Sequence, residues 1–247
     1  MKLLNPSGEK IDFIVEGKKD SDKTLVLVHG FGVDKNESFN LFVDFSEVLG
    51  QHFRIIRFDF TGYGESEGKQ VDVNLQKHTH DLKTIIDYVK KTFPGKIYLY
   101  AHSLGSFITA MLNPNGIDKI IFGAPPSNPC DIAKVFKARI KAKGGKYNPQ
   151  GISIYPRTLY GIQKLGPSFW KVIKNFDEHQ AITNLTQKTN LLILKPMQDD
   201  IAGNNNYEHY KEIKNLTYQE INGNHSFTKP EDRQVLIKKI KQFLLDR

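Results

Sequence analysis

The segment from Lys96 to Leu112 restricts the possible folds more than any other part of the chain. Lys96-Ile-Tyr-Leu-Tyr100 has the length and apolar content of a buried strand, and Phe107-Ile-Thr-Ala-Met-Leu112 has a helix-like pattern. Only a short turn containing Ala101-His-Ser-Leu-Gly105 separates them, so a strand must pass sharply into a helix. Small residues two positions before and after Ser103 let the two backbones approach closely. Such a turn projects the serine hydroxyl above the sheet and predicts a nucleophile.

The same alternation of strand and helix runs along most of the chain. Helical periodicity is clearest over residues 73–93, which Pro94-Gly95 ends, and in the stretch after Pro230. Five further short apolar runs have the length and flanks of buried strands: residues 24–28, 53–58, 118–122, 190–194 and 216–221. Six core strands alternating with helices predict an α/β fold, with a mostly parallel sheet and helices on both faces.

Residues 125–185 break this alternation and predict an inserted cap. They contain an amphipathic stretch at 132–140, a strand-like stretch at 152–155 and a helix-like stretch at 169–173. We therefore expect residues 1–124 and 186–247 to form the core, with the cap between two core strands. Ten Lys and Arg against three Asp and Glu give this segment a net charge of +7, most of the +8 of the whole chain.

The charge of the expected cap has three readings. A solvated basic face on an amphipathic helix is the default. Attraction of anionic substrates or of an acidic surface is the second. Nucleic-acid binding is the third, and we do not expect it, because no recognition motif accompanies the charge.

Two further residues follow predicted strands where a catalytic site would need them. In folds with a strand-to-helix serine turn, the chain order is serine, then an acid, then histidine. Asp199 comes after the strand at 190–194, and His225 comes after the strand ending at Ile221. Both lie past the carboxyl ends of strands, the edge at which open α/β sheets place their sites. Ser103, Asp199 and His225 are therefore candidates for a nucleophile, an acid and a base.

The segment His29-Gly-Phe-Gly32 directly follows the first core strand. A tetrahedral intermediate needs backbone N–H groups that point at its negatively charged oxygen. Folds of this kind take one such group from this loop and one from the residue after the serine. The candidate donors are the N–H groups of Phe31 and Leu104.

These blocks together resemble the α/β-hydrolase family. His29-Gly-Phe-Gly32 looks like its oxyanion loop, Ala101-His-Ser-Leu-Gly105 like its nucleophile elbow, and Gly223-Asn-His225-Ser-Phe like its histidine loop. Asp59-Phe-Thr-Gly-Tyr-Gly-Glu-Ser66 resembles the D-x-x-G-x-G-x-S turn of the family. Within the family the chain is most similar to small-cap serine esterases of the cinnamoyl (feruloyl) type. The resemblance implies hydrolysis of a small carboxylic ester through an acyl-enzyme, with no metal and no cofactor.

Two positions depart from the family pattern. Ala101 replaces the usual glycine, which adds one methyl group to a tight turn. The acid loop has two adjacent aspartates, Asp199 and Asp200. Asp199 is preferred because Ile201 then takes the hydrophobic position two residues after the acid, and Asp200 stays open as the alternative.

Several other residues have structural interpretations. We expect His29 to be buried beside the oxyanion loop and Asp59 to form a turn. His78 and His80 are two apart on a helix, so they point in different directions and do not suggest a metal site. Cys130 is the single cysteine and is expected to be a small residue at the hinge of the cap. Aromatic residues of the cap are candidates for the wall of a binding pocket: Phe136, Tyr155, Tyr160, Phe169 and Trp170.

The amino terminus resembles no signal peptide and no run of 18 apolar residues occurs, so we expect a soluble cytoplasmic protein.

The sequence leaves alternatives for activity. The same catalytic residues serve monoacylglycerol lipases, lysophospholipases, thioesterases and amidases. A non-catalytic binding protein of the same fold is the alternative from another class.

Overall fold

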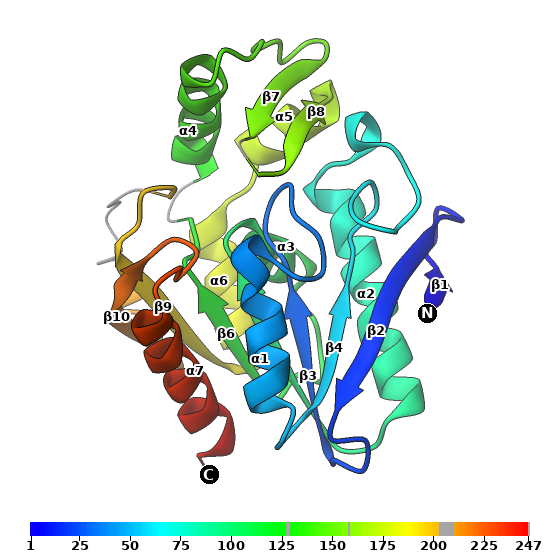
Figure 1. Cartoon of the computed structure of the whole chain (residues 1–247), viewed down its shortest axis with the longest axis vertical. Coiled ribbons are helices and arrows are strands. Elements are labelled where there is room, and N and C mark those ends of the chain that lie inside the picture. The colour runs from blue at the N-terminus through cyan, green and yellow to red at the C-terminus, as the bar shows by residue number, and fades with distance from the viewer. Residues whose placement is uncertain (127–128, 158, 203–209, 247) are drawn as a thin grey trace.

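A central sheet of eight strands dominates the computed structural model, which describes residues 1–126, 129–157, 159–202 and 210–246 (Figure 1). The strand order is β1-β2-β4-β3-β5-β6-β9-β10. The bounds are β1 (Lys2–Leu4), β2 (Lys10–Gly17), β3 (Lys23–Val28), β4 (Arg54–Phe58), β5 (Lys96–His102), β6 (Lys119–Gly123), β9 (Asn190–Gln198) and β10 (Leu216–Asn224). The six expected strands are all present and pair in parallel, whereas β1 and β2 are antiparallel additions at one edge.

Helices cover both faces of the sheet. On one face lie α1 (Leu41–Leu49) and α7 (Pro230–Leu245), and on the other lie α2 (Leu75–Thr92), α3 (Leu104–Leu112) and α6 (Glu178–Thr186). Short 3-10 turns occur at Ser38–Asn40 and Gln70–Asp72. Successive residues of β3 enter different hydrophobic cores, because side chains alternate between the faces of a sheet. The predicted α/β class, with a mostly parallel sheet between helical layers, is confirmed.

The remaining elements lie beyond the carboxyl ends of the parallel strands (Figure 1). They are α4 (Pro129–Ala142), β7 (Ser153–Arg157), β8 (Gly161–Leu165) and α5 (Pro167–Lys174), and β7 pairs with β8 in an antiparallel hairpin. We propose that these elements form the inserted cap. Helix α6, most of which the sequence placed in that segment, packs on α3 and β9, so we propose that it belongs to the core. The side chain of Cys130 lies outside the described residues.

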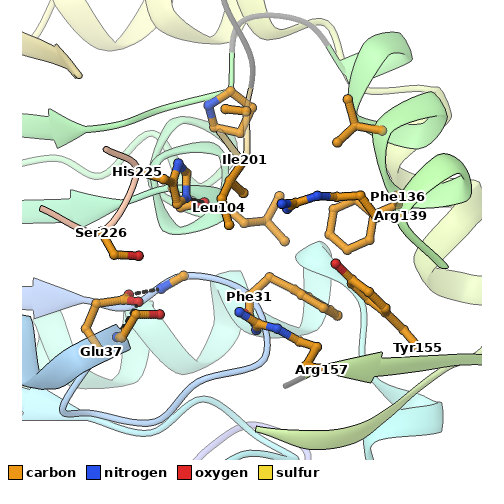
Figure 2. Close-up of a pocket in the computed structure, with 16 residues that line it drawn as sticks. Phe31, Glu37, Leu104, Phe136, Arg139, Tyr155, Arg157, Ile201, His225 and Ser226 are labelled. Atoms are coloured by element: carbon orange, nitrogen blue, oxygen red, sulfur yellow. Dashed lines mark hydrogen bonds between the residues drawn. The ribbon is translucent and has the colours of Figure 1, made fainter. Parts of the chain in front are cut away.

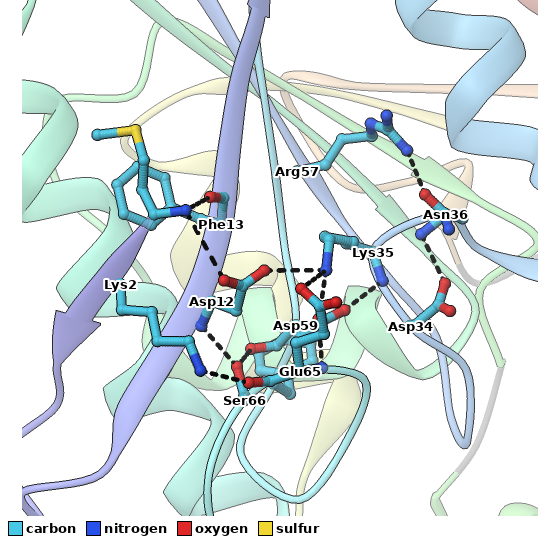
Figure 3. Close-up of polar contacts among 12 residues, drawn as sticks. Lys2, Asp12, Phe13, Asp34, Lys35, Asn36, Arg57, Asp59, Glu65 and Ser66 are labelled. Atoms are coloured by element: carbon cyan, nitrogen blue, oxygen red, sulfur yellow. Dashed lines mark hydrogen bonds and ion pairs between the residues drawn. The ribbon is translucent and has the colours of Figure 1, made fainter.

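A buried ionic cluster holds the turn after β4 (Figure 3). The Asp59 carboxylate accepts hydrogen bonds from the Lys35 backbone N–H at 2.6 Å, from Lys35 Nζ at 2.9 Å and from the Glu65 N–H at 2.9 Å. A side chain on Gly64 would lie 2.2 Å from that carboxylate, so only glycine fits there. Burial alone would lower the pKa of Lys35, but the ion pairs with Asp59 and Asp12 raise this pKa above its usual value. Asp59 is thus a turn-forming residue that also anchors the chain after the expected oxyanion loop.

In the described part of the chain, no helix combines the length and the apolar content needed to cross a bilayer.

Candidate active site

Ser103 occupies a strained turn between β5 and α3. Its backbone angles are φ 50° and ψ −124°, in a region that residues other than glycine seldom adopt. The turn is fixed by a hydrogen bond from the Ser103 N–H to the carbonyl oxygen of Gly123 at 2.9 Å. Ala101 is fully buried in the core, so its methyl group is accommodated. The geometry leaves the hydroxyl exposed above the carboxyl end of β5.

Gly105 allows α3 to pass very close to the strand beneath it. A Cβ atom at this position would lie 2.7 Å from the carbonyl oxygens of both Val28 and His29.

We expect Gly105→Ala to push α3 away from β3 and to lower the free energy of unfolding by about 1–3 kcal/mol. Urea unfolding measures this loss. Gly144→Ala is the matched control, since nothing lies within 4 Å of its added methyl group, although its φ of +68° carries its own strain cost. Equal stability of Gly105→Ala and wild type would contradict the close contact.

Three side chains from separate loops meet above the sheet. His225 follows β10, and its Nε2 lies 2.9 Å from the Oγ of Ser103. Its Nδ1 lies 2.9 Å and 3.0 Å from the two carboxylate oxygens of Asp199, which follows β9. The structure thus brings together the three residues expected from the sequence, in the chain order serine, acid, histidine. A base in contact with the serine and an acid that orients the base is the arrangement that activates a hydroxyl.

The surroundings of Asp199 keep its carboxylate charged. Burial alone would raise its pKa, but the charge of His225, its hydrogen bond and the N–H groups of Ala202 and Ile201 hold the pKa below its usual value. Those two N–H groups donate to Oδ1 at 2.7 Å and 2.8 Å. The neighbouring Asp200 has an exposed side chain, and no hydrogen bond joins it to His225 within the described residues. The geometry therefore favours Asp199 as the partner of the histidine.

The loop after β3 lies directly against the serine. A Cβ atom on Gly30 would be 3.1 Å from the Cβ of Ser103. Phe31 and Leu104 both line the cavity above Ser103. Among the described residues, no hydrogen bond occupies the N–H of either one. Both groups are therefore available to an oxyanion, as the sequence led us to expect.

Two buried side chains hold this loop in place. His29 is fully buried, and its Nδ1 lies 2.8 Å from the carbonyl oxygen of Gly30. Its Nε2 accepts the N–H of Phe60 at 3.0 Å, so the ring donates through Nδ1. Because Gly30 O and Phe31 N share a peptide plane, His29 fixes the direction of one candidate oxyanion donor. His29 therefore has the structural role expected of it.

Glu37 is a buried carboxylate that sequence reasoning missed. Its oxygens accept the N–H of Gly30 at 2.6 Å and the N–H of Ser38 at 2.8 Å. Burial alone would raise the pKa of Glu37, but interaction with His102 and these two hydrogen bonds lower it. Glu37 follows no motif in the sequence, and only the folded loop shows that it anchors Gly30.

The candidate site opens into a cavity between core and cap (Figure 2). Phe136 and Tyr155, two of the expected aromatic residues, line it, and Tyr160 lines an adjoining groove. Phe169 and Trp170 are instead buried, and both pack against Phe136. The full lining is Gly30, Phe31, Glu37, Ser38, Ser103, Leu104, Pro126, Val135, Phe136, Arg139, Tyr155, Arg157, Ile201, Ala202, His225 and Ser226.

The histidines of α2 take no part in this site. His78 is buried and stacks on Phe60 at a centroid distance of 4.6 Å. Its Nε2 lies 3.2 Å from the carbonyl oxygen of Thr61. Burial lowers the pKa of His78 to about 3, so its ring is neutral at physiological pH. His78 is a core residue, in agreement with its position on the apolar face of the helix.

Comparison with known families bears on this geometry. Residues 19–150 match the model of the hydrolase family described as serine aminopeptidase, S33, and they make up more than half of the chain. The chain belongs to this family. The matched part includes the oxyanion loop and the nucleophile elbow, and the chain is therefore a hydrolase of the α/β type.

Solved structures show the same fold over nearly the whole chain. Est1E from Butyrivibrio proteoclasticus, solved with bound ferulic acid, has a TM-score of 0.77 and 23% identity, covering 99% of this chain and 98% of that one. The esterase domain of a Rhodothermus marinus protein has a TM-score of 0.74 and 14% identity, covering 98% and 95%. The core and the cap-forming elements are both included in these alignments, so the α/β-hydrolase fold extends over this chain.

Curated relatives match less of their own length. An uncharacterized protein of Acanthamoeba polyphaga mimivirus is 25% identical over 215 residues, which are 81% of this chain and 64% of that protein. BODYGUARD 2 of Arabidopsis thaliana, named a probable lysophospholipase, is 30% identical over 135 residues, which are 50% of this chain and 28% of that protein. The chain thus spans less than two thirds of the length of either relative.

Proposed function

We propose that this protein is a serine esterase that hydrolyses small carboxylic esters through an acyl-enzyme intermediate. The observation that carries the proposal is the unbroken contact from Ser103 through His225 to Asp199, with both distances at 2.9 Å. The contact ends in a cavity that Phe31 and Leu104 also line. These contacts support the roles of nucleophile, base, acid and oxyanion donors for residues that lie in one place.

The reaction follows from this arrangement. Ser103 Oγ attacks the ester carbonyl carbon while His225 Nε2 takes its proton, and the negative carbonyl oxygen receives hydrogen bonds from the N–H groups of Phe31 and Leu104. His225 then gives the proton to the departing alcohol oxygen, leaving an acyl group on Ser103. Water attacks this acyl group with His225 again as base, and collapse of the intermediate releases the acid and restores the serine.

The cavity supports small esters as the substrate class. Its walls are largely apolar and aromatic, as is typical of sites that bind small molecules. The likeness to an esterase that binds ferulic acid agrees with an aryl or short acyl group, although at 23% identity it establishes only the fold.

A second candidate is hydrolysis of a monoacylglycerol or lysophospholipid. The basic face of α4 and the 30% identity to a probable lysophospholipase favour it. A cationic cap would be attracted to an anionic lipid surface. Chain-length preference and response to micelles separate this candidate from the first.

A series of 4-nitrophenyl esters from acetate to decanoate tests the proposal. We expect turnover with an optimum at short or medium chains, as for an enzyme that takes small esters. An optimum at decanoate, with a rise in rate above the critical micelle concentration, would favour the lipase instead. Absence of turnover across the series would contradict the esterase proposal and favour a binding protein or an amide substrate.

A further inference from the structure

Two arginines of the cap reach into the candidate site. Arg139 comes from α4 and Arg157 from the end of β7, and Figure 2 shows both side chains extending toward the space beside His225 and Ser226. Both also line the open groove that adjoins the cavity. A substrate that extended from Ser103 into the groove would therefore pass both arginines.

Neither arginine forms an ion pair with a carboxylate of the described residues. In the described parts of the chain, no Asp or Glu oxygen lies within 4.0 Å of either guanidinium group. Arg139 Nη2 donates instead to the backbone carbonyl of Asp200 at 3.4 Å. Arg157 Nη1 donates to the carbonyl oxygens of Phe31 and Gly32. Because guanidinium groups stay protonated, they bring two positive charges to the cavity, and their hydrogen bonds in the described structure go only to neutral carbonyl oxygens.

The acids near these charges offset them only in part. Glu37 lines the same cavity, stays charged and attracts Arg157 from a distance, so Glu37 and the two arginines together leave a net charge of +1. Asp200 lines the outer groove with an exposed side chain, where water screens its charge.

Arg157 is held rigidly with part of its hydrogen-bonding capacity unused. Its guanidinium carbon lies 4.9 Å from the ring centre of Tyr160 and 5.9 Å from that of Phe31. Gly32 makes room for it, since a Cβ there would lie 2.6 Å from Nη1. Among the described residues, Nε and Nη2 have no hydrogen-bond partner. These two atoms form the planar edge that binds a carboxylate through two parallel hydrogen bonds.

We propose that Arg139 and Arg157 bind a carboxylate of the substrate, so that the enzyme selects esters bearing a negative charge at the far end of the acyl chain. This inference rests on the proposed esterase function. Half-esters of dicarboxylic acids are the substrate class that combines an ester near Ser103 with such a carboxylate. The two arginines are then specificity-determining residues, distinct from the exposed cap lysines that attract anions only at a distance.

Two substrates of equal chain length test the proposal. 4-Nitrophenyl hexanoate and the mono-4-nitrophenyl ester of adipic acid share a leaving group and a six-carbon acyl chain, and differ in the terminal carboxylate. We expect wild-type kcat/KM to be higher for the adipate ester. Arg139→Gln and Arg157→Gln should each lower kcat/KM for the adipate ester about 10- to 100-fold, mainly by raising KM. This is the size of effect expected when a hydrogen bond to a charged group is lost. Arg139→Gln should change hydrolysis of the hexanoate less than about threefold.

Arg139→Gln is the more decisive variant, because Arg157 also contacts the oxyanion loop and its loss can slow both esters. Lys141→Gln is the matched control, since Lys141 lies on the same helix with an exposed side chain outside the cavity. At 0.5 M salt, Lys141→Gln should leave the ratio of kcat/KM for the adipate ester to kcat/KM for the hexanoate unchanged.

The outcomes are separable. If wild type hydrolyses the hexanoate but does not prefer the adipate ester, the carboxylate site is wrong while the esterase proposal stands. If Arg139→Gln slows both esters equally, the arginine is only a structural residue and the inference is also overturned. If wild type hydrolyses neither ester, the proposed function fails and this inference fails with it.

Discussion

Ser103→Ala is expected to lower kcat for 4-nitrophenyl acetate by about 10⁴- to 10⁶-fold, toward the rate in buffer alone. The variant removes the only atom that contacts His225 Nε2 in the described structure, so no group remains to attack the ester carbonyl and form an acyl-enzyme. Alanine keeps the backbone and the Cβ atom of this position, so the free energy of unfolding should change by less than about 1 kcal/mol. Release of 4-nitrophenolate, measured with a thermal melt of each protein, checks both expectations.

Ser226→Ala provides a matched control for this experiment. Ser226 lines the same cavity, yet no hydrogen bond joins its hydroxyl to His225 within the described residues. We expect its kcat to stay within about threefold of wild type, as for a residue that only contacts the substrate. Equal activity of wild type and Ser103→Ala would show that the elbow is not the catalytic centre and would overturn the proposed function.

The geometry of the candidate site could be predicted because much of it depends on local sequence. A strand, a sharp turn and a helix in immediate succession leave Ser103 one possible orientation, above the carboxyl end of the sheet. Parallel strands bring the loops after β9 and β10 to the same edge, so the strand pattern, together with the chain order serine, acid, histidine, indicated Asp199 and His225, with Asp200 left as an alternative acid. Periodicity also separated His78, on the buried face of α2, from the site.

Other features depend on contacts between distant segments and left no periodic signal. β2 has charged residues at both ends and pairs antiparallel at the sheet edge, where burial is incomplete. α6 is short and carries only two fully buried apolar residues, Ile182 and Leu185, so it was grouped with the cap rather than with α3.

The polar residues around the site also depend on contacts between distant segments, which the sequence pattern does not reveal. Glu37 acquires its role only when the loop after β3 folds back onto Gly30. Arg157 lies about fifty residues beyond Ser103 in the sequence and was one of ten basic residues in its segment. Its direction toward Phe31 and Gly32 follows from the β7–β8 hairpin, whose position over the sheet no local pattern encodes.

Asp199→Asn is expected to lower kcat about 10³- to 10⁴-fold, and it tests the choice between the two adjacent aspartates. The N–H groups of Ile201 and Ala202 would hold the amide oxygen of the new side chain, which turns its NH₂ group toward His225 Nδ1. His225 would then carry its proton on Nε2, facing Ser103, and could not accept the serine proton. The ring would also lose the negative charge that stabilises its protonated form.

Asp200→Asn should lower kcat for neutral esters by less than about threefold, since its exposed side chain can be changed without disturbing a buried contact. Both variants replace an aspartate with asparagine, at adjacent positions of the chain. Each therefore removes one negative charge, so effects on expression or on overall charge are matched. Steady-state hydrolysis of 4-nitrophenyl acetate by both proteins shows which aspartate is the acid that orients His225. A comparable loss in the two variants would mean that the acid loop rearranges when substrate binds and that the 2.9 Å contact between Asp199 and His225 does not define the working triad.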